Sequence, residues 1–197
     1  MNNMNLKTIY AIAVMGMFGI MLSSCHNETL VPKPPTYLRL ELPESSYEMY
    51  DDNCGYSFQL SSLYHLDTAN TPSGGLCTRK IDLGPLNGSM FVYYWDMEQP
   101  LSYYVNNAND EVGNHKLKAT FIGDERIIRS NDRVFGTCFE LQGDVATPFQ
   151  FYLTDSTDRF LYAEVLFNTT PNYDSLKPTL DYLKKDIDTL LQTFKWN

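Results

Sequence analysis

The stretch FQFYLTDSTDRFLYAEVLF, residues 149–167, is the part of this chain that decides its fold class. Apolar and polar side chains alternate over residues 149–154, and they alternate again over residues 160–168. A period of two residues is typical of a strand with one buried face. The polar residues Asp155 to Asp158, which join the two runs, are turn formers. The stretch therefore predicts an antiparallel hairpin.

A long amphipathic helix is predicted to follow this hairpin. Its apolar residues recur at helical spacing and form one stripe: Leu176, Leu180, Leu183, Ile187, Leu190, Leu191 and Phe194. Asp174 and Ser175 are the candidate N-caps, and Pro178 would fall in the first turn, where its missing N–H costs least.

Shorter alternating runs upstream predict further strands. We expect them at residues 37–42, 54–60, 80–83, 89–95, 117–122, 126–129 and 134–142. Turn formers at residues 67–75 predict an exposed loop, and apolar residues at helical spacing predict a helix within residues 100–116. This order predicts an α+β fold, in which an antiparallel β-sheet has its helices packed on one face.

The N-terminus predicts export and lipidation. Lys7 is the only charge before an apolar run at residues 9–22, which ends in Leu22-Ser23-Ser24-Cys25. These are the marks of a secretory signal, and the run is shorter than the roughly 20 residues that a membrane span needs. Residues 22–25 also resemble a bacterial lipobox. We expect residues 1–24 to be a signal peptide and Cys25 to carry lipid; the alternative is an ordinary signal peptide with a coincidental cysteine.

The rest of the chain divides into a spacer and one domain. Residues 25–36 hold Pro32, Pro34 and Pro35, and a proline-rich stretch works as a semi-rigid spacer. Residues 37–197 show no repeat and have the length of a single domain.

The charge of the mature chain limits its partners. After residue 24 it carries 14 basic and 24 acidic side chains, a net charge of −10. Binding to nucleic acid needs clustered Lys and Arg, so no nucleic-acid partner is expected. The same balance opposes electrostatic binding to anionic lipid, so acyl chains would hold the protein on the membrane.

Three cysteines remain beyond the anchor: Cys54, Cys77 and Cys138. Disulfides persist outside the cytoplasm. We favour a Cys54–Cys77 bridge, because both residues lie near loop boundaries whereas Cys138 lies in an apolar strand pattern. The alternative, that all three are small buried apolar residues, stays open.

The sequence shows no clear catalytic or metal-binding pattern, so we expect no enzymatic activity and no cofactor. The chain has no G-x-S-x-G elbow and no glycine-rich phosphate loop. Of the three histidines, His26 lies beside the anchor, and we expect His65 and His115 to be solvated surface residues because no second ligand stands at metal-binding spacing. Asp155 to Asp158 could supply oxygens to calcium, but the hairpin turn explains the same residues better.

Aromatic residues are concentrated around one strand and the helix after it. They are Tyr93, Tyr94, Trp95, Tyr103 and Tyr104. Tyr93, Trp95, Tyr103 and Tyr104 are candidates for an exposed partner or ligand surface. Alternatively both sheet faces are partly covered and the rings are core, which we favour because aromatic residues are ordinary in strands.

Several phrases resemble one known family. They are PPTYLRLELP (34–43), CGYSF (54–58), RVFG (133–136) and QFYLTDST (150–157), followed by DSLKP (174–178) and a terminal TFKW (193–196). In their order, with the lipobox, they resemble the gliding motility lipoprotein GldD family of Bacteroidetes. The resemblance covers most of the mature chain and is weaker between residues 60 and 115.

This resemblance implies a lipoprotein of the outer membrane that supports gliding motility and type IX secretion, with partners among the envelope proteins of that apparatus and no catalytic activity. A sheet followed by a terminal helix is also similar to the Mog1/PsbP-type fold. The alternative function is that of an envelope lipoprotein that binds a small ligand in an aromatic-lined pocket. An envelope hydrolase would need a nucleophile or acid paired with a base, and the sequence shows no such pair.

Overall fold

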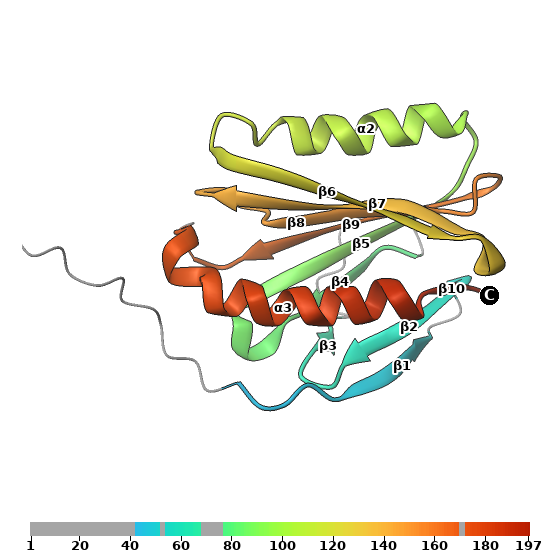
Figure 1. Cartoon of the computed structure of the whole chain (residues 1–197). Helices are drawn as coiled ribbons and strands as arrows, with labels where there is room; N and C mark the ends of the chain where they lie inside the picture. The colour runs from blue at the N-terminus through green and yellow to red at the C-terminus, as the bar shows by residue number, and fades with distance from the viewer. Residues whose placement is uncertain (1–41, 52–53, 68–76, 170–171) are drawn as a thin grey trace, which may run out of the picture. The chain divides into compact units, whose positions relative to one another are not determined.

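The computed structural model describes residues 42–51, 54–67, 77–169 and 172–197. Its elements, in chain order, are β1 (Tyr47–Asp51), β2 (Tyr56–Ser61), β3 (His65–Leu66), β4 (Arg79–Asp82), the 3₁₀ turn η1 (Gly84–Leu86), β5 (Gly88–Asp96), α2 (Leu101–Gly113), β6 (Ala119–Arg129), the 3₁₀ turn η2 (Ser130–Asp132), β7 (Val134–Gly143), β8 (Phe149–Thr154), β9 (Arg159–Phe167), α3 (Tyr173–Thr193) and β10 (Lys195–Trp196). The fold is α+β, as predicted (Figure 1).

Two antiparallel sheets form the framework. The larger has seven strands in the order β3-β4-β5-β9-β8-β7-β6, and the smaller has the order β1-β2-β10. The predicted hairpin is confirmed as β8 and β9, which pair from Gln150 opposite Glu164 to Thr154 opposite Phe160. Strand β5 pairs along the other side of β9. The hairpin therefore lies at the centre of the larger sheet.

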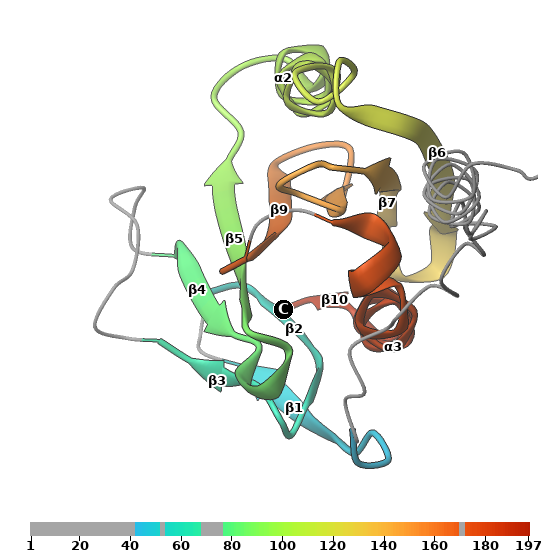
Figure 2. The ribbon, with the colours of Figure 1, turned by 90° about the vertical axis from the view of Figure 1, so that its left-hand side faces the viewer.

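The two described helices, α2 and α3, cover opposite faces of the larger sheet, so the expectation that the helices share one face is wrong. Figure 1 shows α2 above the sheet and α3 below it, and Figure 2 shows the same order from the side. The cause is that β9 is apolar on both faces. Leu161 and Ala163 pack with α3, whereas Phe160 and Tyr162 pack beneath α2.

The main core lies between the larger sheet, α3 and the smaller sheet. Its members include Phe151 and Leu153 from β8, Leu183 and Ile187 from α3, and Phe58 from β2. Burial of each such side chain stabilises the fold by about 1.5–3 kcal/mol. The layer beneath α2 is thinner, because only Ala108 and Val112 of that helix are buried. Helix α2 is therefore held by fewer apolar residues than α3.

Helix α3 begins earlier than the sequence suggested. Asn172 is its N-cap: its backbone is extended, and its side chain accepts a hydrogen bond from the Ser175 N–H at 3.1 Å. Asp174 and Ser175 are already inside the helix, so the prediction that one of them caps it is wrong. Pro178 accordingly lies in the second turn, not the first, and is exposed to solvent.

Two further differences concern strands. The runs predicted at residues 117–122 and 126–129 form one strand, β6, because backbone pairing with β7 continues through the polar residues Asp124 and Glu125. Strands β1, β3 and β10 were not predicted, since β1 is only partly buried and β3 and β10 have two residues each. The strand predicted at residues 37–42 and the loop at residues 67–75 fall largely outside the described residues.

The structure joins Cys54 to Cys77 by a disulfide, with 5.5 Å between their Cα atoms. Cys138, on β7, is a free buried thiol. Burial raises the pKa of this thiol to about 12.

Candidate functional site

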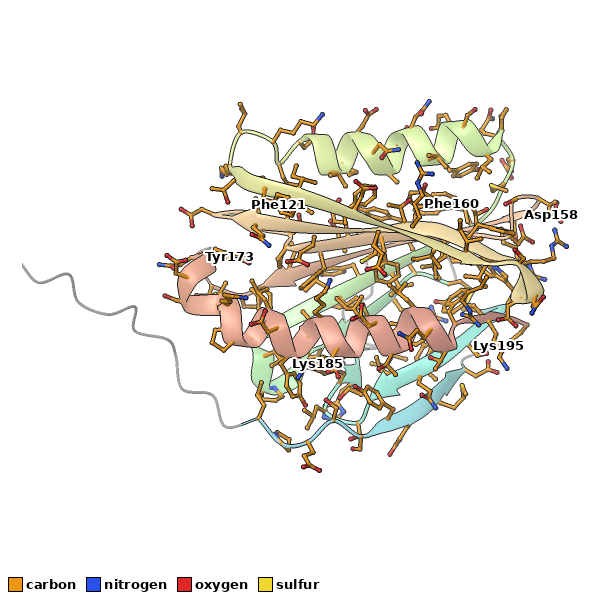
Figure 3. The ribbon with its side chains drawn as sticks, in the orientation of Figure 1. Phe121, Asp158, Phe160, Tyr173, Lys185 and Lys195 are labelled. Carbon is orange, nitrogen blue, oxygen red and sulfur yellow. A yellow bond between two sulfur atoms is a disulfide. The ribbon has the colours of Figure 1, made fainter. Side chains whose placement is uncertain are left out.

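A cleft of about 430 Å³ opens between α2 and the face of the sheet formed by β5 and β9. It is lined by Tyr93, Trp95, Tyr103, Tyr104, Asn107, Ala108, Glu111, Phe160, Tyr162 and Glu164. The structure thus brings together all four residues proposed from the sequence as a partner or ligand surface. Figure 3 marks Phe160 in the layer between the sheet and α2.

Strand alternation and one helical turn place the aromatic side chains. Tyr93 and Trp95 point toward α2 from β5, because side chains two residues apart share a face. Tyr94 points to the opposite face, where its ring lies 5.7 Å from that of Tyr56 and 6.4 Å from that of Trp196. Tyr103 and Tyr104 come from the first turn of α2.

The rings of the cleft contact one another but are not fully buried. Tyr93 and Trp95 stack with centroids 6.0 Å apart, and Tyr104 lies 6.4 Å from Trp95. Tyr93 and Tyr104 are half-buried, whereas Trp95 is 37% exposed and Tyr103 is 53% exposed. The rings are therefore partly core and partly open surface.

Two carboxyl groups also face this cleft, Glu164 from β9 and Glu111 from α2. The Tyr93 hydroxyl donates to Glu164 Oε1 at 3.4 Å. Burial raises the pKa of Glu164, and the charge of Glu111 raises it further, against the opposing effect of the Tyr93 hydrogen bond. Burial, then Glu164 and Glu111, raise the pKa of Tyr93 to about 12. The site is thus a negatively charged cleft with aromatic walls.

A chain of hydrogen bonds, of which the first two are buried and the last is partly buried, runs from the floor of the cleft to the segment just after α2. The Tyr162 hydroxyl donates to Gln150 Oε1 at 3.1 Å, and Gln150 Nε2 donates to Thr147 Oγ1 at 2.7 Å. Thr147 Oγ1 in turn lies 2.7 Å from His115 Nε2. Burial lowers the pKa of His115, and Lys118 lowers it further, whereas Glu111 raises it.

His115 is therefore not the solvated surface residue that was predicted. It is half-buried, because the chain folds back after α2 and places its ring beside Thr147. His65 is exposed, as expected, and His26 lies outside the described residues.

The carboxyl groups of the cleft were missed in the sequence, since they come from a helix and a strand whose packing no local pattern reveals. One signal was present: Glu164 is the only charged side chain in the apolar run at residues 160–167. Acidic side chains are rarely buried unless they are paired, so an isolated Glu in a buried strand indicates a functional or structural role.

The Asp155 to Asp158 segment is the turn between β8 and β9. Asp155 Oδ1 accepts hydrogen bonds from the backbone N–H groups of Thr157, Asp158 and Arg159, at 2.9, 2.9 and 3.1 Å. Burial by itself would raise the pKa of Asp155, but these donors lower it overall. Among the described residues, no group of three or more His, Cys, Asp or Glu side chains is arranged to hold a metal ion.

A second buried carboxylate, Asp186 on α3, was also missed in the sequence. It is 4% exposed and accepts hydrogen bonds from Ser45 Oγ at 3.1 Å and Tyr47 Oη at 2.8 Å. Its other oxygen accepts from the Tyr64 hydroxyl. Burial, followed by this hydrogen bond and the charge of Asp186, raises the pKa of Tyr64. Because all three donors come from the segment around β1 and β2, Asp186 joins that segment to α3.

Within the described residues, no helix has both the length and the apolar composition needed to cross a membrane. No curated protein matches the chain. Among solved structures it is similar to the solution structure of cyanobacterial PsbP (CyanoP) from Synechocystis sp. PCC 6803. The two share 13% identity with a TM-score of 0.46, over 83% of this chain and 100% of that one.

One protein family matches most of the chain. The family described as gliding motility lipoprotein GldD matches residues 27–196, which include every element of both sheets and both described helices. The match also includes all the residues of the cleft. It begins two residues after Cys25, the residue predicted to carry the lipid. The chain belongs to the gliding motility lipoprotein GldD family.

Proposed function

We propose that the protein is a non-enzymatic component of the gliding and type IX secretion apparatus, held at the outer membrane by acyl chains on Cys25. The observation that carries this proposal is the family match over residues 27–196, and it is supported by the lipobox-like residues 22–25 that stand just before the matched region. Residues 1–24 would be removed as a signal peptide, residues 25–36 would act as anchor and spacer, and residues 37–197 would form the domain. Its partners would be other envelope proteins of the same apparatus.

The state of Cys138, the free thiol among the described residues, supports a non-enzymatic role. Cys138 is buried, and burial raises its pKa to about 12. The thiol therefore keeps its proton near neutral pH, whereas a cysteine nucleophile needs the thiolate form.

Lipid attachment is tested by growing cells with a labelled fatty acid and comparing wild type with Cys25→Ala. The wild-type protein should carry label and fractionate with the outer membrane. The variant should carry none and keep its uncut signal. A labelled Cys25→Ala protein, or an unlabelled wild type with residues 1–24 removed, would contradict the proposal.

Partnership is tested by chemical crosslinking in intact cells, followed by purification of a tagged protein from solubilised membranes. We expect gliding or type IX secretion components to be recovered in repeated experiments. A matched control is a tagged envelope lipoprotein of unrelated family at the same abundance. Recovery of the same proteins with both baits would count against a specific role.

A second function has its own support, binding of a small ligand in the cleft lined by Tyr93, Trp95, Tyr103 and Tyr104. The volume of about 430 Å³ lies in the range of small-molecule sites, about 300–1,000 Å³. Walls of aromatic side chains with a few polar groups are also typical of such sites. Ligand binding and the scaffold role are compatible, since a scaffold protein can bind a side chain of its partner in such a pocket.

A further inference from the structure

We propose that the cleft between α2 and the β5–β9 face binds an organic cation, with the ammonium or guanidinium group enclosed by Tyr93, Trp95 and Tyr104 and neutralised by Glu111 and Glu164. The inference rests on the ligand-binding function proposed above and adds the chemistry of the ligand. The cation could be the side chain of a Lys or Arg in a partner protein or a free amine, and the two share the same recognition chemistry.

The aromatic walls have the composition that binds cations. A cation gains energy over the face of Trp or Tyr when it lies within about 6 Å of the ring centroid, and several rings together form an aromatic cage. Tyr93 and Trp95 come from β5, and Tyr104 comes from α2. The ring centroid of Trp95 lies 6.0 Å from that of Tyr93 and 6.4 Å from that of Tyr104. Trp95 is 37% exposed. A ligand would cover this exposed aromatic surface.

The two carboxyl groups supply the negative charge. Neither Glu111 nor Glu164 forms an ion pair with any residue that the structure describes, and no Lys or Arg lines the cleft. Glu164 is half-buried and receives only the long Tyr93 hydrogen bond among the described side chains. A partly desolvated carboxylate without a cationic partner is costly. A bound cation would remove that cost.

The same charges exclude other ligand classes. An anion would be repelled by both carboxylates. A neutral ligand, such as a sugar stacked on Trp95, would desolvate the carboxylates further without neutralising them. A cation alone gains from the rings and from the acids at once, so charge complementarity selects it.

The binding experiment uses the mature acylated protein in a neutral detergent and four probes: arginine amide, choline, glucose and acetate. Binding is measured by calorimetry and by the fluorescence of Trp95, with Trp196→Phe as background because the chain has two tryptophans. We expect arginine amide and choline to bind saturably, and glucose and acetate not to bind. Trp95→Ala should abolish the signal of both cations in calorimetry.

The variants Glu111→Gln and Glu164→Gln test the role of charge. Each keeps the size of the side chain and should weaken cation binding by roughly fivefold or more. Glu125→Gln, an exposed acid on β6 at the far edge of the sheet, is the matched control and should leave binding unchanged. Glu111 is exposed on α2, so its substitution leaves folding intact even if Glu164→Gln does not.

The outcomes separate this inference from the function on which it rests. Glucose binding without cation binding would overturn the inference that the ligand is a cation, but would keep the proposed ligand-binding function. If no probe binds, both the inference and the ligand-binding function are overturned. Unchanged cation affinity in both glutamine variants would also overturn the inference. A blocked Gly-Arg-Gly peptide that binds more tightly than arginine amide and choline would identify a protein side chain as the source, and the reverse order would identify a free amine.

Discussion

At the scale of single residues, Asp186 explains how the N-terminal segment of the domain is held. A buried carboxylate is stable only when its oxygens are hydrogen-bonded, and here three hydroxyl groups do this. Asp186→Ala removes the acceptor and leaves the buried Tyr64 hydroxyl without it. Because hydrogen bonds to charged groups contribute about 1.5–3 kcal/mol, we expect the free energy of unfolding to fall by about 2–4 kcal/mol. Urea denaturation measures this change.

The control for Asp186→Ala is Asp181→Ala on the same helix. Asp181 is exposed and pairs with Lys177 one turn away, an interaction that contributes at most about 0.5 kcal/mol. Equal destabilisation by the two variants would mean that the buried hydroxyl contacts have no special role.

Asp155 makes the stability of the fold depend on pH in the acidic range. Its pKa is lowered in the folded chain, so its carboxylate contributes stability above its unfolded pKa of about 4, and that contribution is lost as the pH falls through the lower folded pKa. Asp155→Asn keeps an oxygen acceptor for the turn but cannot ionise. We expect it to cost about 1 kcal/mol at pH 7 and nothing at a pH below the folded pKa.

The measurement is urea denaturation of both proteins from pH 7 down to the acid limit of folding. Asp144→Asn, at an exposed position between β7 and β8, is the control and should show no such convergence. A difference between wild type and Asp155→Asn that stays constant with pH would disprove the role of the charge.

At the scale of elements, the disulfide joins the segment just before β2 to the segment just before β4, each cysteine lying two residues ahead of its strand. We expect the bridge between Cys54 and Cys77 to be present in protein isolated from the envelope. Alkylation of the denatured, unreduced protein should then label Cys138 alone among these three residues, and all three after reduction. The double variant Cys54→Ala/Cys77→Ala should lose about 3 kcal/mol of stability, through the loop it frees.

Two controls accompany the thiol assay. Cys138→Ala should take up no label without reduction, and the folded wild type should label slowly because burial raises the pKa of Cys138 to about 12. Label on Cys54 or Cys77 before reduction would show that the bridge does not form.

Elements with strong side-chain patterns were predictable from the sequence, and elements stabilised by distant partners were not. The β8–β9 hairpin and α3 were predicted because their apolar residues recur at the spacing of a strand and of a helix, respectively. Strand β1 has only partly buried side chains, and its place depends on pairing with β2. The N-cap at Asn172 depends on one hydrogen bond, which no periodicity encodes.

The same distinction holds for the cleft. The aromatic residues were found because they are close in sequence, at positions 93–95 and 103–104. Glu111 and Glu164 are 53 residues apart and meet only because α2 crosses the face of β5 and β9. Whether α2 packs above or below the sheet decides the chemistry of the site, and the amphipathic pattern of α2 is too weak to show this.

At the scale of the whole domain, four of the six phrases that carry the family resemblance meet at one end of the fold: CGYSF, RVFG, QFYLTDST and TFKW. The Arg133 guanidinium donates to Thr157 Oγ1 in the β8–β9 turn, and the Trp196 indole donates to the carbonyl of Arg133. The Asn197 N–H donates to the carbonyl of Gly55. Figure 3 labels Asp158 of the turn and Lys195 of the terminal strand at this end. These four separate phrases therefore form one structural junction.

The last prediction concerns how the whole molecule stays at the membrane. The mature chain carries a net charge of −10, and none of the described helices could span a bilayer. If acyl chains alone hold it, then 1 M salt or an alkaline wash of membranes should release none of it, because neither treatment affects acyl insertion. Detergent should release all of it. Immunoblots of the supernatants measure this.

The informative variant combines Leu22→Ala, Ser24→Ala and Cys25→Ala, which replaces the lipobox by a small-residue site for ordinary signal cleavage. Its mature part keeps every described residue of the domain and lacks only the lipid. Because an acidic surface is not attracted to anionic lipid, we expect this chain in the soluble fraction of the envelope. If it instead sediments with membranes and leaves them in 1 M salt, a protein partner holds the domain there, and the lipid is a second attachment.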